Sequence, residues 1–379
     1  MRPAGGPAGG FVPPAYPYDR LVPARRRAEA WPGGAVDLSV GTPTDPPPEA
    51  ALAALAGADQ SGWVRGYPPS VGAPELLDAI VAWTARRFGV ELAPDHVGAC
   101  VGTKELVATL PRWLALRTPG RDTVLYPALS YPTYSMGAQL AGLRAVPVPA
   151  GAGFRMDLAA VDPADAGRAL LLWVNSPGNP AGQIEDLVRA ASWGRDRSIL
   201  VASDECYVEL TWDGPGRTIL ESGTAGVLAV HSLSKRSNLA GLRLGWYAGD
   251  PGMVAYLRQI RKHLGMMVPG PVQLAGVAAL SDQDHVDAQR ALYQARLARM
   301  GDILAALGVG GVGCPGGGLY LWAPAPGGDG WAFTERLAAE AGVVVSPGEL
   351  YGPAGAGHVR IAMVSPMDRL DLVAERLGL

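Results

Sequence analysis

Residues 227–245 read Val-Leu-Ala-Val-His-Ser-Leu-Ser-Lys-Arg-Ser-Asn-Leu-Ala-Gly-Leu-Arg-Leu-Gly, an apolar run followed by a polar turn. This turn contains Lys235, one of only three lysines among thirty-two basic residues; the others are Lys104 and Lys262. Lysine can lose its proton when it is desolvated and then act as an amine nucleophile, which arginine cannot do. The few lysines are therefore candidates for chemistry, and Lys235 is the best placed because it directly follows a strand-like run.

Similar apolar runs alternate with helical segments from about residue 100 onward. The expected strands are residues 123–126, 145–148, 170–175, 199–204, 227–232 and 244–248. Apolar spacing predicts helices over residues 21–30, 49–55, 74–88 and 105–116. Several strands are continuous apolar runs, as expected for parallel strands covered on both faces. The pattern predicts a three-layer α/β domain with a mainly parallel central sheet.

The last third of the chain has a different pattern, which indicates a smaller α+β domain. One long helix is expected over residues 272–307. Short β-like pieces at 319–322, 343–345 and 358–364 then alternate with helices at 331–341 and 368–377. The predicted division is a disordered tail (1–15), an N-terminal segment that joins the small domain (16–40), a large domain (41–270) and the small domain (271–379).

Composition excludes several classes of function. A net charge of −3 gives no reason to expect a nucleic acid or an anionic membrane as partner. Three widely spaced cysteines without C-x-x-C spacing argue against a disulfide framework or a zinc site, and no metal site is expected. No signal peptide is recognisable, and no apolar stretch approaches the roughly 18 residues of a membrane span. We therefore expect a cytoplasmic protein.

Polar residues follow the predicted strands where parallel-sheet proteins gather their ligands, at the carboxyl ends. They are Tyr131, Asn175-Ser-Pro-Gly-Asn179-Pro, Asp204-Glu-Cys-Tyr207 and His231-Ser-Leu-Ser-Lys235. Each alone is commonplace, since Asp often caps a helix and Asn-Pro often forms a turn. Together they supply what a pyridoxal phosphate site needs: Lys235 for a Schiff base, and Asp204 to keep the pyridine nitrogen protonated.

The proposed chemistry follows from these two groups. An ionised Asp204 beside the ring nitrogen would raise the pKa of that nitrogen, because an opposite charge favours the protonated form. The protonated ring could then accept electrons from the substrate's α-carbon, and the Lys235 amine could move the α-proton as general base and acid.

Donors for the cofactor phosphate are also expected. Gly102, Thr103 and Lys104 form a turn that opens a helix, whose N-terminus offers free N–H groups and a favourable dipole. Ser232 and Ser234 add hydroxyls, and Arg243 adds a forked cation. In isolation, Gly102–Lys104 could equally be an ordinary helix start.

The order of these elements resembles the fold-type-I, class I/II aminotransferases. This resemblance implies a PLP-transferase fold of type I, in which Tyr131 stacks on the pyridine ring and Asn179 and Tyr207 hydrogen-bond its 3′-oxygen. Arg360, in His358-Val-Arg-Ile-Ala-Met, is implied as the ligand of the substrate α-carboxylate, helped by Asn179 and the Gly41 backbone.

The resemblance also implies a homodimer with composite active sites. Tyr67, in Gly66-Tyr-Pro-Pro, would reach the cofactor phosphate of the neighbouring subunit.

More narrowly, the chain is similar to actinobacterial N-succinyldiaminopimelate aminotransferases. The motifs that carry this similarity are residues 37–43, 102–106, 131–134, 203–207, 231–241, 261–263, 265–269 and 347–352. It implies transfer of an amino group from N-succinyl-LL-2,6-diaminopimelate to 2-oxoglutarate, giving N-succinyl-2-amino-6-oxopimelate and glutamate, in lysine and diaminopimelate biosynthesis. Ala181 replaces the usual Thr, and residues 308–318 are unusually rich in glycine, which leaves open a biosynthetic relative with a changed substrate.

A substrate with distal carboxylates needs a second cation, for which Lys262 and Arg261 are candidates. The alternative for both is a solvated helix face, which we favour for Arg261.

Other functions stay open at this point. They are a transaminase for another amino acid and a C–S β-lyase on the same fold, which needs a leaving group at the β-carbon. A PLP-sensing regulator is disfavoured because fewer than forty Gly/Pro-rich residues precede Val36, too few for a DNA-binding module. A purely structural protein is disfavoured because every catalytic position is filled.

Overall fold

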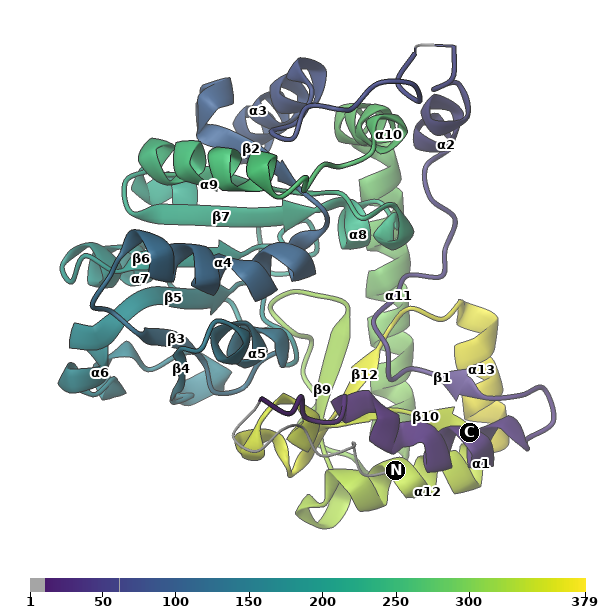
Figure 1. Ribbon diagram of the computed structural model, residues 1–379. Helices are drawn as coiled ribbons and strands as arrows, with labels where there is room; N and C mark the ends of the chain where they lie inside the picture. The colour runs from purple at the N-terminus through teal and green to yellow at the C-terminus, as the bar shows by residue number, and fades with distance from the viewer. Residues whose placement is uncertain (1–10, 61) are drawn as a thin grey trace.

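A computed structural model describes residues 11–60 and 62–379. Its main sheet has seven strands in the order β2-β8-β7-β6-β5-β3-β4 (Figure 1). The strands are β2 (Val97–Cys100), β3 (Thr123–Pro127), β4 (Arg144–Val148), β5 (Ala169–Asn175), β6 (Leu200–Asp204), β7 (Val227–Ser232) and β8 (Gly245–Gly249). Strand β8 is antiparallel to both neighbours, whereas the remaining pairs are parallel. The predicted, mainly parallel sheet is confirmed.

Helices cover both faces of this sheet. One face packs against α4 (Thr103–Arg117), α5 (Thr133–Leu140) and α9 (Pro251–His263). The opposite face packs against α2 (Glu49–Ala56), α3 (Pro74–Phe88), α7 (Leu187–Arg195), α8 (Leu233–Arg236) and α10 (Gly270–Ser281). The short helix α6 (Pro163–Arg168) precedes β5. This arrangement confirms the three-layer architecture.

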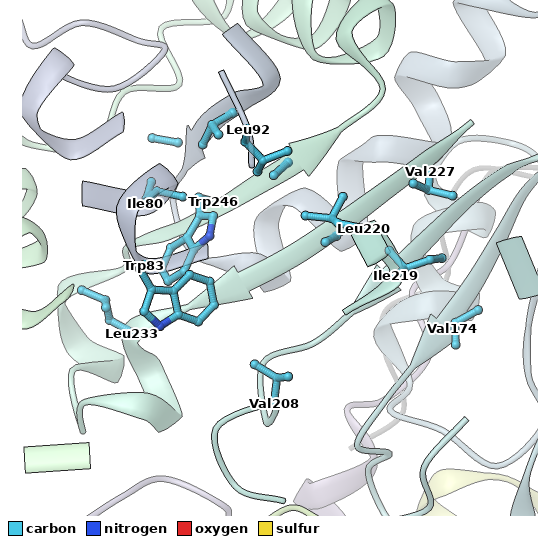
Figure 2. Close-up of a cluster of buried hydrophobic side chains, with 14 of the residues drawn as sticks. Ile80, Trp83, Leu92, Val174, Val208, Ile219, Leu220, Val227, Leu233 and Trp246 are labelled. Carbon is cyan, nitrogen blue, oxygen red and sulfur yellow. The ribbon is translucent and has the colours of Figure 1, made fainter. Parts of the chain in front are cut away.

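Successive side chains along the buried strands point to opposite faces of the sheet and so contribute to a separate core on each face. In β7, Leu228 and Val230 enter the core under α4, whereas Val227 and Ala229 enter the opposite core. Figure 2 shows this second core, where Trp83 of α3 lies against Trp246 of β8 with ring centroids 5.2 Å apart. Strands buried on both faces explain why the sequence shows continuous apolar runs.

The smaller part of the molecule is built on two short sheets. Strands β9 (Tyr320–Pro324), β12 (His358–Ala362) and β11 (Ser346–Pro347) are antiparallel, and β1 (Val36–Asp37) pairs in parallel with β10 (Val343–Val344). Helices α1 (Val22–Glu29), α12 (Gly330–Ala341) and α13 (Met367–Arg376) surround them. In Figure 1, α1 runs along α12, and α11 (Asp284–Ala306) leads from the large sheet to the small ones.

The predicted division at residues 16, 41 and 271 stays a prediction. Residues 1–10 of the predicted disordered tail lie outside the described residues, and residues 11–15 belong to no helix or strand. Within the described part of the chain, no helix is long and apolar enough to cross a membrane.

Two expectations differ from the structure. The single helix expected over 272–307 is wrong: α10 ends at Ser281 and α11 begins at Asp284. Asp282 lies at this break, where its carboxylate accepts a hydrogen bond from the Asp284 N–H at 3.0 Å, so a short polar side chain starts the second helix. Strand β2 is not predicted at all, because its four residues Val-Gly-Ala-Cys become a strand only by pairing with β8.

Candidate active site

A cavity of about 510 Å³ lies at the carboxyl ends of the central strands. Adjacent strands bring polar residues together there: Asn175 at the end of β5 pairs in register with Asp204 at the end of β6, and β7 lies beside it. Twelve of the predicted site residues line this cavity: Gly41, Thr103, Lys104, Tyr131, Asn179, Asp204, Tyr207, Ser232, Ser234, Lys235, Arg243 and Arg360.

Lys235 is held at the cavity by the short helix α8. The Ser232 hydroxyl caps this helix, accepting from the Ser234 N–H at 3.3 Å, and Lys235 follows one residue later. The Lys235 Nζ donates to the Gly41 carbonyl. Burial, with the positive charges of Arg360 and Arg243, lowers the pKa of Lys235 to about 8. The amine is therefore much closer to its nucleophilic form at neutral pH than an exposed lysine.

Asp204 presents a buried carboxyl group to the same cavity. It accepts hydrogen bonds from the Tyr134 hydroxyl at 2.8 Å and from the Cys206 N–H at 3.3 Å. Burial nevertheless raises the pKa of Asp204, and within the described residues it forms no ion pair. A cation placed beside it would stabilise the ionised form, so a pyridine nitrogen that carries a proton fits this position.

The N-terminus of α4 and Arg243 form an anion-binding corner. Helix α4 begins at Thr103, two residues earlier than predicted, and among the described residues no side chain caps its first N–H groups. Gly102 has φ +75°, and a Cβ added there would lie 2.2 Å from Arg243 Nη2. Glycine is needed at this position both for the backbone conformation and for the close approach of the guanidinium. A phosphate group fits these donors.

Arg360 lies on β12, in the smaller part of the molecule, and its side chain reaches the cavity. Its side chain is only 2% exposed. Nη1 donates to Asn179 Oδ1 at 2.9 Å and Nη2 donates to the Ser39 carbonyl at 2.6 Å. Its Nε finds no hydrogen-bond partner among the described residues. A buried guanidinium with a free donor suits a carboxylate ligand.

Tyrosines surround these charged groups. The rings of Tyr320 and Tyr351 lie 4.1 and 4.8 Å from the Arg360 guanidinium. The Tyr207 hydroxyl is 2.8 Å from the Tyr320 hydroxyl. A Cβ on Gly41 would lie 2.1 Å from the Tyr320 hydroxyl, so only glycine fits between Tyr320 and the Lys235 amine.

Tyr131 closes the opposite wall. Its hydroxyl accepts from Lys104 Nζ at 3.2 Å and lies 3.2 Å from the Tyr16 hydroxyl.

Two predicted residues lie away from the cavity. Tyr67 is 94% exposed on the surface of the chain, so its predicted role in a neighbouring subunit stays a prediction. Lys262 is exposed on α9 and, within the described residues, is not part of the cavity lining.

The favoured interpretation of Arg261 as a solvated residue is wrong. Arg261 is completely buried and donates to both oxygens of Glu105, at 3.0 and 2.8 Å. Glu105 Oε2 in turn accepts from the Val101 N–H at 3.3 Å, so this ion pair fixes the turn before α4.

Sequence reasoning missed several residues of the site. Tyr134 lies three residues after Tyr131, at the start of α5, and this closeness in sequence could have indicated that both reach the cavity. Tyr320 has no such local indication, because its contact with Tyr207 spans 113 residues. Cys206, whose thiol donates to the Thr103 hydroxyl at 3.3 Å, and Tyr16 and Tyr18 of the N-terminal segment also line the cavity.

Comparison with known proteins places the chain in context. Residues 34–377 match the family model described as aminotransferase class I and II. The chain is 42% identical to the 4-dedimethylamino-4-oxo-anhydrotetracycline transaminase OxyQ of Streptomyces rimosus, over 96% of this chain and 99% of that protein. It is 37% identical to the LL-diaminopimelate aminotransferase of Desulforudis audaxviator, over 96% of this chain and 95% of that protein.

A solved structure resembles the chain over almost its whole length. It is a probable N-succinyldiaminopimelate aminotransferase from Thermus thermophilus, with a TM-score of 0.86 and 32% identity. The likeness covers 95% of this chain and 98% of that structure.

Proposed function

The chain belongs to the class I and II aminotransferases, and from this premise we propose that it transfers an amino group from N-succinyl-LL-2,6-diaminopimelate to 2-oxoglutarate. Membership makes it a pyridoxal phosphate enzyme of fold type I that acts on amino acids and 2-oxo acids. The products of the proposed reaction are N-succinyl-2-amino-6-oxopimelate and glutamate, which places it in lysine and diaminopimelate biosynthesis.

One observation carries the catalytic assignment: a single cavity contains Lys235, Asp204 and Arg360, contributed by both parts of the molecule. Pyridoxal phosphate supplies an aldehyde that condenses with amines and a ring that accepts electrons from the substrate's α-carbon. We assign Lys235 as the attachment point and as the base that moves the α-proton with its Nζ. Asp204 holds the ring nitrogen protonated, and Arg360 binds the α-carboxylate.

The remaining assignments follow the family resemblance, and the residues concerned line the cavity. The N-terminus of α4, Ser232, Ser234 and Arg243 would hold the phosphate, whose charge would compensate the exposed guanidinium of Arg243. Tyr131 would pack against the ring, and Asn179 and Tyr207 would donate to the ring oxygen. Asn179 also holds Arg360 through its amide oxygen.

A homodimer is part of the proposal. We expect Tyr67, which is exposed on the single chain, to contact the phosphate in the partner's cavity.

The substrate class rests on two further points. Both the Thermus neighbour and the Desulforudis relative bear names of aminotransferases for diaminopimelate or its N-succinyl derivative. In the cavity, Lys104 is a cation without a carboxylate partner among the described residues. Because Lys262 is not at the cavity, Lys104 replaces it as the residue that we propose for a distal acidic group.

The relationship to OxyQ favours a second candidate, amination of a ring ketone. Such a ketone lacks an α-carboxylate, so Arg360 would pair with the amino donor but not with the ketone acceptor. We prefer the amino-acid substrate because its α-carboxylate pairs with the buried guanidinium in both half-reactions.

A panel of amino donors, assayed against 2-oxoglutarate by glutamate formation, tests the proposal. The panel contains N-succinyl-LL-diaminopimelate, LL-diaminopimelate and aspartate. The N-succinyl compound should give the highest kcat/KM. Higher kcat/KM with LL-diaminopimelate, or turnover only of an anhydrotetracycline 4-ketone with glutamate as donor, would overturn the substrate assignment. A release of pyruvate and ammonia, with homocysteine from cystathionine or with sulfide from cysteine, would indicate a β-lyase instead.

A further inference from the structure

The glycine-rich run Gly308–Gly318 has two halves with different surroundings. A Cβ added at Gly308, Gly310, Gly311 or Gly313 would meet no atom of the described residues within 4 Å. In the second half, a Cβ at Gly317 would lie 2.5 Å from Pro177 Cγ and 2.9 Å from the Leu210 carbonyl, and one at Gly316 would lie 2.9 Å from Ile184 Cγ1. The second half is therefore packed so closely that only glycine fits.

Residues 316–318 insert between two loops of the large domain. The Gly317 N–H donates to the Gly182 carbonyl at 3.0 Å, and the Gly318 N–H donates to the Leu210 carbonyl at 2.7 Å. The Trp212 N–H donates to the Gly316 carbonyl at 3.0 Å. Backbone hydrogen bonds on both sides thus fix the position of residues 316–318 relative to the two loops.

The two loops carry residues of the active site. The loop that ends at Gly182 contains Asn179, whose amide oxygen binds Arg360 at 2.9 Å. The turn before Leu210 contains Tyr207, and the Leu210 N–H donates to the Tyr207 carbonyl at 2.8 Å.

Two residues beyond Gly318, Tyr320 begins β9. Its hydroxyl lies 2.8 Å from that of Tyr207, and its ring lies 4.1 Å from the Arg360 guanidinium. The glycine run is therefore joined by backbone hydrogen bonds to the loops that carry Asn179 and Tyr207, and it leads directly into the strand that carries Tyr320.

We infer that Gly316 and Gly317 are positioning residues, which set β9 and Arg360 against the loops of Asn179 and Tyr207 and so fix the carboxylate-binding geometry. A side chain at either position would push the small-domain strand away from these loops. Two contacts would then lengthen together, that of Arg360 with Asn179 and that of Tyr207 with Tyr320. Lys235 and the anion-binding corner lie on other elements. This inference rests on the proposed role of Arg360 in binding the substrate carboxylate.

Alanine substitutions within the same run test this inference with a matched control. Gly310 and Gly317 both lack the left-handed backbone conformation, so Gly310→Ala and Gly317→Ala differ mainly in what the new Cβ meets. We measure KM and kcat for L-glutamate as amino donor in the purified holoenzyme. Gly317→Ala should raise KM by roughly ten- to a hundredfold, as expected for a misplaced binding group, and Gly310→Ala should leave it unchanged. A mere loss of folded protein would lower kcat at unchanged KM.

A second pair of variants keeps the test decisive where Gly317→Ala fails to fold. Gly316→Ala meets mainly the Ile184 side chain, so Ile184→Ala should relieve it in the double variant. KM should rise in Gly316→Ala and return toward the wild-type value in Gly316→Ala/Ile184→Ala. An unchanged KM in Gly316→Ala and Gly317→Ala, while Arg360→Ala weakens binding, would overturn the positioning role alone. An unchanged KM in Arg360→Ala as well would overturn the carboxylate assignment itself.

Discussion

Replacement of Arg360 by alanine should weaken the binding of every substrate that carries an α-carboxylate. The guanidinium is 2% exposed and uses two of its nitrogens to hold Asn179 and Ser39, which leaves Nε without a partner among the described residues. The α-carboxylate would thus bind a preoriented guanidinium that is almost fully buried. Arg360→Ala leaves that carboxylate without its counter-charge.

The size of the effect follows from the burial of the pair. Removing one partner of a buried, hydrogen-bonded charge pair costs about 2–5 kcal/mol. At about 1.4 kcal/mol per factor of ten, binding should weaken by roughly 30-fold to several thousand-fold. Arg360→Lys keeps the positive charge but loses the planar fork, so its effect should lie between those of the wild type and the alanine variant.

The assay is a titration of the purified holoenzyme with L-glutamate, followed by the change of the cofactor absorbance. Arg369→Ala is the matched control, because Arg369 likewise donates two hydrogen bonds through its guanidinium, to the Gly33 and Ala35 carbonyls, but lies outside the cavity lining within the described chain. Equal cofactor content and similar unfolding temperatures establish that both variants fold. An apparent dissociation constant of Arg360→Ala within twofold of the wild type would refute the reasoning.

Three further outcomes are expected. Lys235→Ala should keep the circular dichroism spectrum and lose transaminase turnover; wild-type turnover would remove Lys235 from its role. In the apoenzyme, the rate of cofactor attachment, measured by absorbance, should rise with pH and level off above about 8, because burial lowers the pKa of Lys235 to about 8; a rise that continues toward 10.5 would indicate an unperturbed amine. Burial raises the pKa of Glu205 to about 8, so the folded protein binds this proton more tightly than the unfolded chain does. The free energy of unfolding should therefore fall as pH rises toward 8, and Glu205→Gln should reduce this fall in thermal unfolding. Burial lowers the pKa of His231 from 6.5 to about 3, so this residue lowers the free energy of unfolding only below pH 6.5, where the unfolded chain takes up the proton. Measurements therefore start at pH 6.5. An unchanged pH slope in Glu205→Gln would contradict the assignment.

The glycine-rich run shows what composition alone leaves undecided. From the sequence, the glycines of residues 308–318 leave open a relative with a changed substrate and say nothing about packing. In the structure, Gly316 and Gly317 are packed against Ile184, Pro177 and Leu210. In an open loop glycine provides backbone flexibility, whereas in a packed loop it lets neighbouring atoms come close to the backbone. Only the residues that surround the loop in space distinguish the two cases.

The sequence by itself determined the elements whose causes are local. Helix α3 was predicted with the correct bounds because Pro74 begins it, Gly89 follows it with φ +66°, and an apolar face runs between them. Continuous apolar runs likewise predicted the buried parallel strands, and the polar residues that follow them, Asp204 and Lys235, identified the edge of the sheet where the cavity lies.

Only the tertiary structure decided which distant residues meet. Glu105 and Arg261 are 156 residues apart, and Arg360 lies 181 residues from Asn179, yet both pairs form buried hydrogen bonds. Periodicity and turn residues report on the burial and backbone of a local segment, but they carry no information on which segment packs against it. The lysine that we propose for the Schiff base could therefore be found from its own stretch, residues 227–245. The environment that lowers its pKa, including the charge of Arg360, exists only once the small sheets are packed beside the large one.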